Sequence, residues 1–299
     1  MRITIFGAGS LGSLVGGLLA REHDVVLVGR DPHVSRSRDS GLTIDGELAT
    51  TVQLDARRDV PDRVGLAVIC VKAFDTTTAA EALSGADIDA CLSLQNGLGN
   101  EATLADQLAV PVLAGTCTYG ALLESPGTVT CTGRGTVVLG ARDGGSLPLA
   151  DRVGDAFATA GLDVTVAEDM PRRLWEKLAV NAGINATTAL ARVDNGVLCS
   201  DDGNAVATAA ARETAAVARA TGIDLPTSTA VEATERVAAT TAANVSSMRQ
   251  DVRDGRRTEV DAINGYVVDK GNEFGVETPT NRTLCRLLRA WERGRGLRP

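Results

Sequence analysis

Lys177, Asn181 and Asn185 recur at four-residue intervals in W-E-K-L-A-V-N-A-G-I-N, inside a stretch whose pattern predicts a helix over about 169–190. Residues four apart share one face of a helix, so a cation and two carboxamides would point the same way. Asparagine in a helix interior costs roughly 0.5 kcal/mol relative to alanine. Two asparagines on one face therefore indicate that this face has a polar function. The alternative is a solvated helix face.

A second polar segment is S-S-M-R-Q-D-V-R-D-G-R-R-T-E-V-D at residues 246–261. Its serines precede a short predicted helix as an N-cap, an arrangement that can also offer N–H groups to a carboxylate. Thr258 is predicted to cap a further helix over 258–274, with Asp261 completing a capping box. Glu259 would then lie in the first turn, where the helix dipole keeps a carboxylate ionised. Capping alone accounts for the hydroxyls and Asp261, whereas Glu259 is a candidate for chemistry.

The elements that must position these residues begin with a nucleotide-binding pattern at the N-terminus. A β-rich run at 2–6 leads into G-A-G-S-L-G at 7–12, then a helical pattern to about Arg21 and a second β run at 24–28. This order of strand, glycine motif, helix and strand predicts dinucleotide binding. The predicted cofactor-binding residues of the motif are Gly7, Ala8, Gly9, Ser10, Leu11 and Gly12.

The residue after the second β run indicates which dinucleotide is used. Gly29 is followed by Arg30, which suits the 2′-phosphate of NADP, whereas NAD-binding domains place an acidic residue there. Asp31 comes next and could serve a ribose, so NAD is the alternative cofactor; an ordinary exposed loop arginine is the structural alternative for Arg30.

Further β runs at 65–71, 88–94, 110–116, 126–140 and 162–166 alternate with helical stretches near 76–84 and 99–109. This alternation predicts a Rossmann-type, doubly wound, mostly parallel sheet over residues 1–167. Loops at the carboxyl ends of such strands line the ligand crevice. Two of them carry Lys72 and Asn96, although a solvated lysine and simple turn chemistry at Asn96-Gly97 are the alternatives.

Residues 168–299 are predicted to form an all-helical domain, since the β pattern stops near Glu168. Further helices are expected at about 201–221, 226–241 and 280–293. We expect the substrate to bind in the cleft between a Rossmann domain and a helical domain.

The inventory of proton donors narrows the chemistry. Histidine is the usual donor in carbonyl reduction, but the chain has only His23 and His33, both beside the second strand at the adenosine end. Lysine is the natural replacement, and the chain has three. Lys270 is predicted to be a charge at a helix C-terminus and Lys72 belongs to the cofactor crevice, which leaves Lys177.

Composition excludes several classes of protein. The net charge of −8 argues against a nucleic-acid partner. No run of about 18 apolar residues is present, so no membrane span is expected. A signal peptide is not expected either, because the sequence opens directly into a strand pattern. Six cysteines without metal-ligand spacing indicate free thiols, a reducing cytoplasmic setting and no metal. The alanine-rich helices could bury a homodimer face, but nothing demands one.

The chain resembles the ketopantoate reductases (2-dehydropantoate 2-reductases) over nearly its whole length. The resemblance rests on G-A-G-S-L-G at 7–12, Arg30, V-K-A at 71–73, Q-N-G at 95–97, W-E-K-L-A-V-N-A-G-I-N at 175–185, N-G-V-L at 195–198, S-S-M-R-Q-D-V at 246–252, G-R-R-T-E-V-D at 255–261 and I-N-G-Y at 263–266. It implies reduction of a 2-oxo acid to a 2-hydroxy acid by NADPH, for pantothenate and coenzyme A synthesis.

The resemblance also implies roles for individual residues. Lys177 would donate the proton, and Glu259 would hydrogen-bond the substrate hydroxyl and border the cofactor. The remaining assignments are substrate contacts by Asn181, Asn185 and Asn195, a carboxylate contact by Ser247, and positioning of cofactor and substrate by Lys72 and Asn96. Two alternatives stay open: a paralogous reductase of another 2-oxo acid, and a dinucleotide sensor without catalysis.

Overall fold

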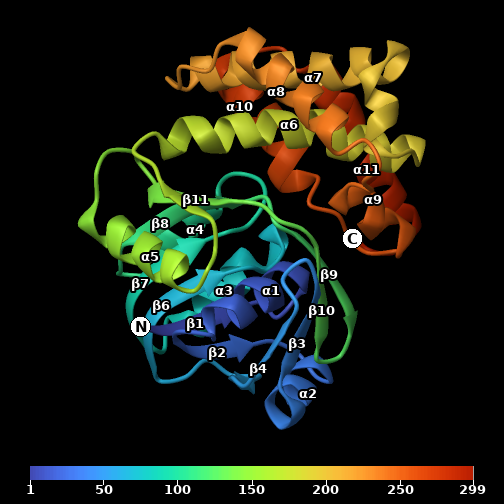
Figure 1. Ribbon diagram of the computed structural model, residues 1–299. Helices are drawn as coiled ribbons and strands as arrows, with labels where there is room; N and C mark the ends of the chain where they lie inside the picture. Colours follow the sequence, from blue (N-terminus) through green and yellow to red (C-terminus); the bar gives the residue numbers. More distant parts are fainter. Residues whose placement is uncertain (299) are drawn as a thin grey trace. The chain divides into compact units, whose positions relative to one another are not determined.

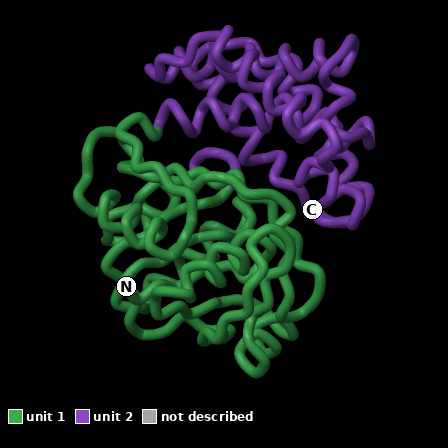
Figure 2. Tube along the Cα trace, in the orientation of Figure 1, with its two compact units in different colours: residues 1–95, 100–170 green, residues 96–99, 171–299 purple. Residues whose placement is uncertain are grey.

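The computed structural model describes residues 1–298, which form two compact units. The first comprises Met1–Gln95 and Asn100–Met170, and the second comprises Asn96–Gly99 and the chain from Pro171 onward (Figure 2). The first unit is α/β and the second is helical (Figure 1), so the predicted fold class is confirmed.

An eight-stranded sheet organises the first unit, in the order β12-β11-β8-β7-β6-β1-β2-β5. All neighbouring strands are parallel except β8 and β11, which are antiparallel. The strands are β1 (Arg2–Phe6), β2 (Asp24–Val28), β5 (Asp55–Arg57), β6 (Arg63–Ile69), β7 (Asp87–Ser93), β8 (Val112–Cys117), β11 (Val137–Ala141) and β12 (Val164–Val166).

Helices cover both faces of this sheet because its central strands are apolar on both sides. Along β6, Leu66 and Val68 pack into the core that contains α1 (Ser10–Leu19) and α5 (Pro148–Thr159). Ala67 and Ile69 pack into the opposite core with α3 (Thr76–Leu83) and α4 (Asn100–Gln107). The short helices α2 (His33–Ser40) and η1 (Ala73–Asp75) follow β2 and β6.

A second sheet of four strands, in the order β4-β3-β10-β9, was not anticipated from the sequence. Its strands are β3 (Leu42–Gly46), β4 (Thr50–Val52), β9 (Gly120–Ser125) and β10 (Thr128–Gly133). The β-rich run predicted over 126–140 divides here, with β10 in the small sheet and β11 in the large one. At the crossing, a Cβ on Gly135 would lie 2.4 Å from the backbone of Thr118, so only glycine permits this close approach.

The second unit packs its helices closely because their contact faces are built from small residues. Most alanines of α6 and several of α7 and α8 are buried, and a Cβ on Gly183 would lie 2.6 Å from the carbonyl oxygen of Ala207. The helical elements are α6 (Met170–Ala191), η2 (Asn195–Cys199), α7 (Asp201–Ala220), α8 (Thr227–Thr240), α9 (Ser247–Arg253), η3 (Asp261–Gly265), α10 (Tyr266–Phe274) and α11 (Pro279–Gly294).

The sequence also led to expectations about the cysteines, membrane-spanning helices and metal ligands. All six cysteines are free thiols, as predicted. Within residues 1–298, no helix combines the length and hydropathy that crossing a bilayer requires. Across the same residues, no three histidine, cysteine or acidic side chains gather as metal ligands.

Candidate active site

Two of the three motif glycines have a steric reason within the chain to lack a side chain, and the third does not. Gly7 has φ +114°, and a Cβ there would lie 2.7 Å from the backbone nitrogen of Val71. A Cβ on Gly12 would lie 2.0 Å from the carbonyl oxygen of Gly7, so glycine at this position lets α1 begin close to the end of β1. A Cβ on Gly9 would meet nothing within 4 Å, so the space above this exposed residue is open.

That open space lies at the N-terminus of α1. Gly9 is the N-cap residue of α1, no side chain caps the first turn, and no acidic residue lies in it. The Ser10 hydroxyl is turned to β9, where it accepts a hydrogen bond from the backbone nitrogen of Leu123 at 3.1 Å. A helix N-terminus with uncapped N–H groups and a glycine beside it fits a phosphate group, so the loop fits the pyrophosphate of a dinucleotide.

Arg30 follows β2 with its side chain 92% exposed, and its guanidinium lies 4.0 Å from the Asp75 carboxylate. Asp31 has a structural task, because its Oδ1 accepts a hydrogen bond from the backbone nitrogen of Ser35 at 3.2 Å within α2. Of the two adjacent residues, the arginine is therefore the better placed to meet a ligand in solution.

A buried carboxamide connects the loops that carry Lys72 and Asn96. Gln95 Nε2 donates to the carbonyl oxygen of Val71 at 3.2 Å and to Thr76 Oγ1 at 2.8 Å. Thr76 Oγ1 in turn lies 2.9 Å from Asn100 Oδ1. The loops after β6 and β7 are thereby held together at the carboxyl edge of the sheet.

The polar stripe of α6 is not a solvated face. Lys177 and Asn181 are half-buried, and Asn185 is buried with 7% of its surface exposed. Asn185 is thus the most buried of the three residues. Burying polar groups costs free energy unless they find partners, which favours a binding surface over a solvent-facing one.

The predicted capping box at Thr258 is wrong. The Thr258 N–H donates to Glu292 Oε1 at 2.8 Å rather than to Asp261, and the Asp261 carboxylate accepts from Arg289 Nε at 2.8 Å. The predicted continuous helix over 258–274 is also corrected, since its first part is a π-helical turn, η3, preceding α10. Such turns are rare and often occur at functional sites.

Glu259 lies two residues before η3 rather than inside a first α-helical turn. It is buried, with 6% of its surface exposed, and its carbonyl oxygen accepts from the backbone nitrogens of Ala262 and Ile263, each at 3.1 Å.

Asn96 belongs to a segment that packs against this same turn. Gly97 has φ +84°, and a Cβ there would lie 2.5 Å from the carbonyl oxygen of Ala262. The backbone nitrogen of Leu98 donates to that same oxygen at 3.1 Å. The Asn96-Gly97 pair therefore lies in a bend of the backbone whose positive φ favours glycine, and this bend holds Asn96 near the residues that follow Glu259.

The serine block meets the later part of α6, because Ser246 Oγ lies 2.7 Å from Thr188 Oγ1. Asn195 binds the residues just before that block, since its backbone nitrogen donates to the Asn244 carbonyl oxygen at 3.1 Å. Ser246 caps α9, as predicted, by accepting from the Arg249 backbone nitrogen at 3.2 Å, and Ser247 is exposed in the first turn. Asn195 is buried and donates through Nδ2 to Thr241 Oγ1 at 2.9 Å. Among the described residues, its buried Oδ1 accepts no hydrogen bond.

The two histidines and Lys270, which the sequence analysis did not assign to catalysis, have structural roles. His33 is buried between Ser13 Oγ, 2.8 Å from Nε2, and the backbone nitrogen of Gly127, which donates to Nδ1 at 3.0 Å. His23 Nε2 lies 2.7 Å from the Ala156 carbonyl oxygen. Lys270 was predicted to be a C-terminal helix charge, but it pairs with Glu273 at 2.7 Å before the last turn of α10.

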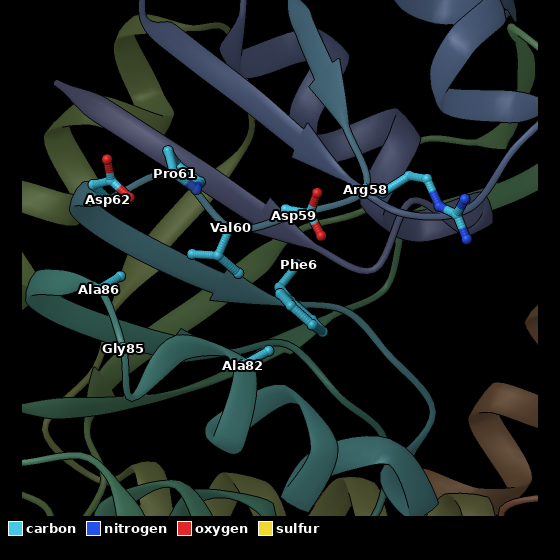
Figure 3. Close-up of a pocket in the computed structure, with 9 residues that line it drawn as sticks. All are labelled: Phe6, Arg58, Asp59, Val60, Pro61, Asp62, Ala82, Gly85 and Ala86. Carbon is cyan, nitrogen blue, oxygen red and sulfur yellow. The ribbon is translucent and has the colours of Figure 1, made fainter.

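A depression of about 400 Å³ opens on the first unit where β1 ends (Figure 3). Phe6 and Ala82 line it from the sheet and α3, and the chain from Arg58 to Asp62 forms its other wall. None of the predicted site residues lines this depression.

Two family models cover most of the chain. Residues 3–144 match the model described as ketopantoate reductase PanE/ApbA, and residues 169–292 match the model of its C-terminal part. The chain belongs to the ketopantoate reductase PanE/ApbA family.

Relatives in this family match from end to end. A 2-dehydropantoate 2-reductase of Halobacterium salinarum is 43% identical, with 98% of this chain and 99% of the relative covered. Another, from Archaeoglobus fulgidus, is 39% identical over 98% of each chain.

Solved structures agree with these matches. A PanE/ApbA family ketopantoate reductase of Ralstonia eutropha has a TM-score of 0.90 at 33% identity, over 99% of this chain and 100% of that one. D-mandelate dehydrogenase, in its ternary structure with NADH and anilino(oxo)acetate, has a TM-score of 0.93 at 26% identity over the full length of both.

Sequence reasoning missed the residues that hold the family's motifs in place. Gln95 and Thr76 connect two loops, and Glu292 and Arg298 anchor the segment around Glu259. The glutamine was visible beside Asn96 in Q-N-G, but no local pattern marks Glu292, which lies 34 residues from its partner Thr258.

Proposed function

We propose that the protein reduces 2-dehydropantoate to pantoate with NADPH. The observation that carries the proposal is the half-buried to buried stripe of Lys177, Asn181 and Asn185 on one face of α6, in a chain of the ketopantoate reductase family. A lysine beside two carboxamides can bind a 2-oxo acid and protonate the oxygen that its reduction creates. Relatives named for this activity support the choice of substrate.

The proposed division of labour follows from the chemistry of each side chain. When bound, the nicotinamide supplies a hydride to C2 of the oxo acid. Lys177 Nζ donates a proton to the C2 oxygen, and Glu259 accepts a hydrogen bond from a substrate hydroxyl. The proposed substrate contacts are completed by Asn181, Asn185 and Asn195 through their amides and by Ser247 at the carboxylate.

Removal of the Lys177 amine tests this assignment. For Lys177→Ala we expect kcat to fall by roughly 10²–10⁴-fold, the usual contribution of a positioned acid, while NADPH still binds. A variant with unchanged kcat would refute the role of Lys177, and a protein that binds NADPH but reduces no 2-oxo acid would be the dinucleotide sensor.

The cofactor preference is a separate proposal that rests on Arg30. Its exposed guanidinium suits the 2′-phosphate of NADPH, which NADH lacks. We expect Arg30→Ala to reduce kcat/KM with NADPH by about tenfold or more and to change the value with NADH little. Equal losses with both cofactors would contradict this role. Lys72 and Asn96 are proposed to position cofactor and substrate.

A second candidate substrate has a specific observation in its favour. The structure of D-mandelate dehydrogenase is closely similar, and it was solved with anilino(oxo)acetate, an aryl-bearing oxoacetate derivative. A panel of 2-oxo acids, compared by kcat/KM, separates the two proposals: a preference for an aryl or other 2-oxo acid over 2-dehydropantoate would replace the first one.

The cellular setting follows from the proposed reaction. Pantoate is consumed in pantothenate and coenzyme A synthesis, so we propose a cytoplasmic enzyme. Its proposed partner is the small-molecule 2-oxo acid substrate and not a nucleic acid. Homodimer formation through the alanine-rich helical unit stays a proposal, which sedimentation of the purified chain would test.

A further inference from the structure

Glu292 is a fully buried carboxylate in the last turn of α11, although a helix C-terminus disfavours negative charge. Its Oε1 accepts from both the backbone nitrogen of Thr258, at 2.8 Å, and Thr258 Oγ1, at 2.6 Å. Its Oε2 accepts from Arg298 Nε at 2.9 Å. A buried charge persists only where it is paired and hydrogen-bonded, and this one is used to hold Thr258.

The guanidinium of Arg298 reaches a second acid as well. Its Nη2 donates to Asp261 Oδ2, while the other oxygen of Asp261 accepts from Arg289 at 2.8 Å. Burial raises the pKa of Asp261, but hydrogen bonds from Arg298 and Arg289 outweigh it and hold that pKa below its usual value. One side chain near the end of the chain, 14% exposed, thus joins Glu292 to Asp261.

These two anchored positions lie on either side of Glu259. Thr258 precedes it and Asp261 begins the π-helical turn two residues after it. The next residue, Ala262, presents the carbonyl oxygen on which Leu98 and Gly97 pack. The anchoring of Thr258 and Asp261 therefore determines where Glu259 lies and, one contact further, where the segment with Asn96 lies.

We propose that Arg298 is a positioning residue for this site: with Glu292 it clamps the segment Thr258–Gly265 and so fixes Glu259 and Asn96 for catalysis. The proposal deepens the proposed reductase function and rests on it for its kinetic readout. Arg298 acts through other residues and has no contact with substrate in this scheme.

Arginine suits this task because its planar fork donates from Nε and Nη2 at once, to two different carboxylates. Lysine would keep the charge but could hold only one acid firmly. Arg298→Ala removes the links to both carboxylates, whereas Arg298→Lys should keep one of the two links. Arg293→Ala is the matched control, since Arg293 lies exposed on the same helical end.

The experiment measures kcat and KM for 2-dehydropantoate, together with hydrogen exchange of backbone amides, in the full-length variants. For Arg298→Ala we expect kcat/KM to fall by about tenfold or more, because a misplacement near 1 Å costs as much. Amides of residues 258–265 and 96–99 should exchange faster, while those of α7 and of the glycine loop keep wild-type rates. Arg298→Lys should recover part of both effects, and Arg293→Ala should match the wild type.

Two results would overturn the proposal. One is wild-type kinetics in Arg298→Ala despite faster exchange at 258–265; the other is faster exchange spread evenly over the helical unit, which marks a general stability role. If the wild-type protein reduces no 2-oxo acid, the proposed function fails by itself, and the exchange pattern still decides whether Arg298 clamps this segment. Should Arg298→Ala fail to fold, Arg298→Lys carries the same comparison.

Discussion

Alanine at Gly9 or at Gly12 is expected to damage the protein in two different ways, although the change is one methyl group in both cases. At Gly9 the backbone is extended, with φ −89° and ψ −165°, which alanine adopts readily, and the methyl meets nothing within 4 Å. Replacing glycine at such a position stabilises a fold by about 0.4–1 kcal/mol through the unfolded chain. Alanine is a poorer N-cap than glycine by roughly 0.5–1 kcal/mol, so the two effects offset each other. Gly9→Ala should therefore keep the wild-type stability to within about 1 kcal/mol.

At Gly12 the same methyl would lie 2.0 Å from the carbonyl oxygen of Gly7. The obstacle is backbone rather than a flexible side-chain end, so α1 or the β1 end must move. Alanine gains about 1 kcal/mol of helix propensity over glycine, but overpacking of a tight core costs typically 1–3 kcal/mol and more where backbone must shift. We expect Gly12→Ala to lose stability on balance.

Gly9→Ala should have little effect on stability but should weaken cofactor binding. A phosphate that approaches the N-terminus of α1 needs the space that the new methyl fills, so the affinity for NADPH should fall by about tenfold or more. Thermal unfolding without and with NADPH, and fluorescence titration of the cofactor, measure the two effects separately. Wild-type affinity in Gly9→Ala, or wild-type stability in Gly12→Ala, would refute this reading of the loop.

Three further predictions concern groups away from the glycine loop. Thr76→Val should lower the stability by about 1–3 kcal/mol and should also lower kcat/KM, because Gln95 and Asn100 lose the hydroxyl between them. Thr76→Ser should retain the wild-type stability and kcat/KM. Thr214→Val, which removes a hydroxyl hydrogen bond inside α7, should lower the stability without changing kcat/KM. Burial lowers the pKa of His33 from 6.5, so below pH 6.5 the unfolded chain binds more protons than the folded one. Stability should therefore fall as the pH drops from 6.5 towards the folded-state pKa, and His33→Gln should flatten that part of a urea-unfolding series; an unchanged slope would contradict it. Phe157→Ala should cost about 3–5 kcal/mol of unfolding free energy in chemical denaturation, because its fully buried ring leaves a cavity, while kcat/KM with saturating cofactor stays near the wild-type value.

Local patterns were enough to predict the elements that carry the motifs. The strand, glycine motif and helix at the N-terminus follow from neighbouring residues, and so does α6, whose bounds of Met170–Ala191 lie close to the expected 169–190. Both depend on periodicity and steric needs within about 20 residues.

The missed features depend on contacts between distant residues. The small sheet pairs β3 with β10, which are separated in the sequence by about half of the nucleotide-binding domain, and no local pattern specifies that pairing. The capping box failed for the same reason: Thr258 has a good local partner in Asp261, but a buried acid 34 residues later takes its N–H group. Propensity rules predict caps correctly only where tertiary contacts leave them uncontested.

The assignment of Asn96–Gly99 to the helical unit has a mechanical consequence. The backbone passes from one unit to the other after Gln95, after Gly99 and again after Met170, so three peptide connections join them instead of one. A single cut at residue 170 cannot produce two intact modules, because the nucleotide-binding fragment would retain four residues whose packing partners it has lost.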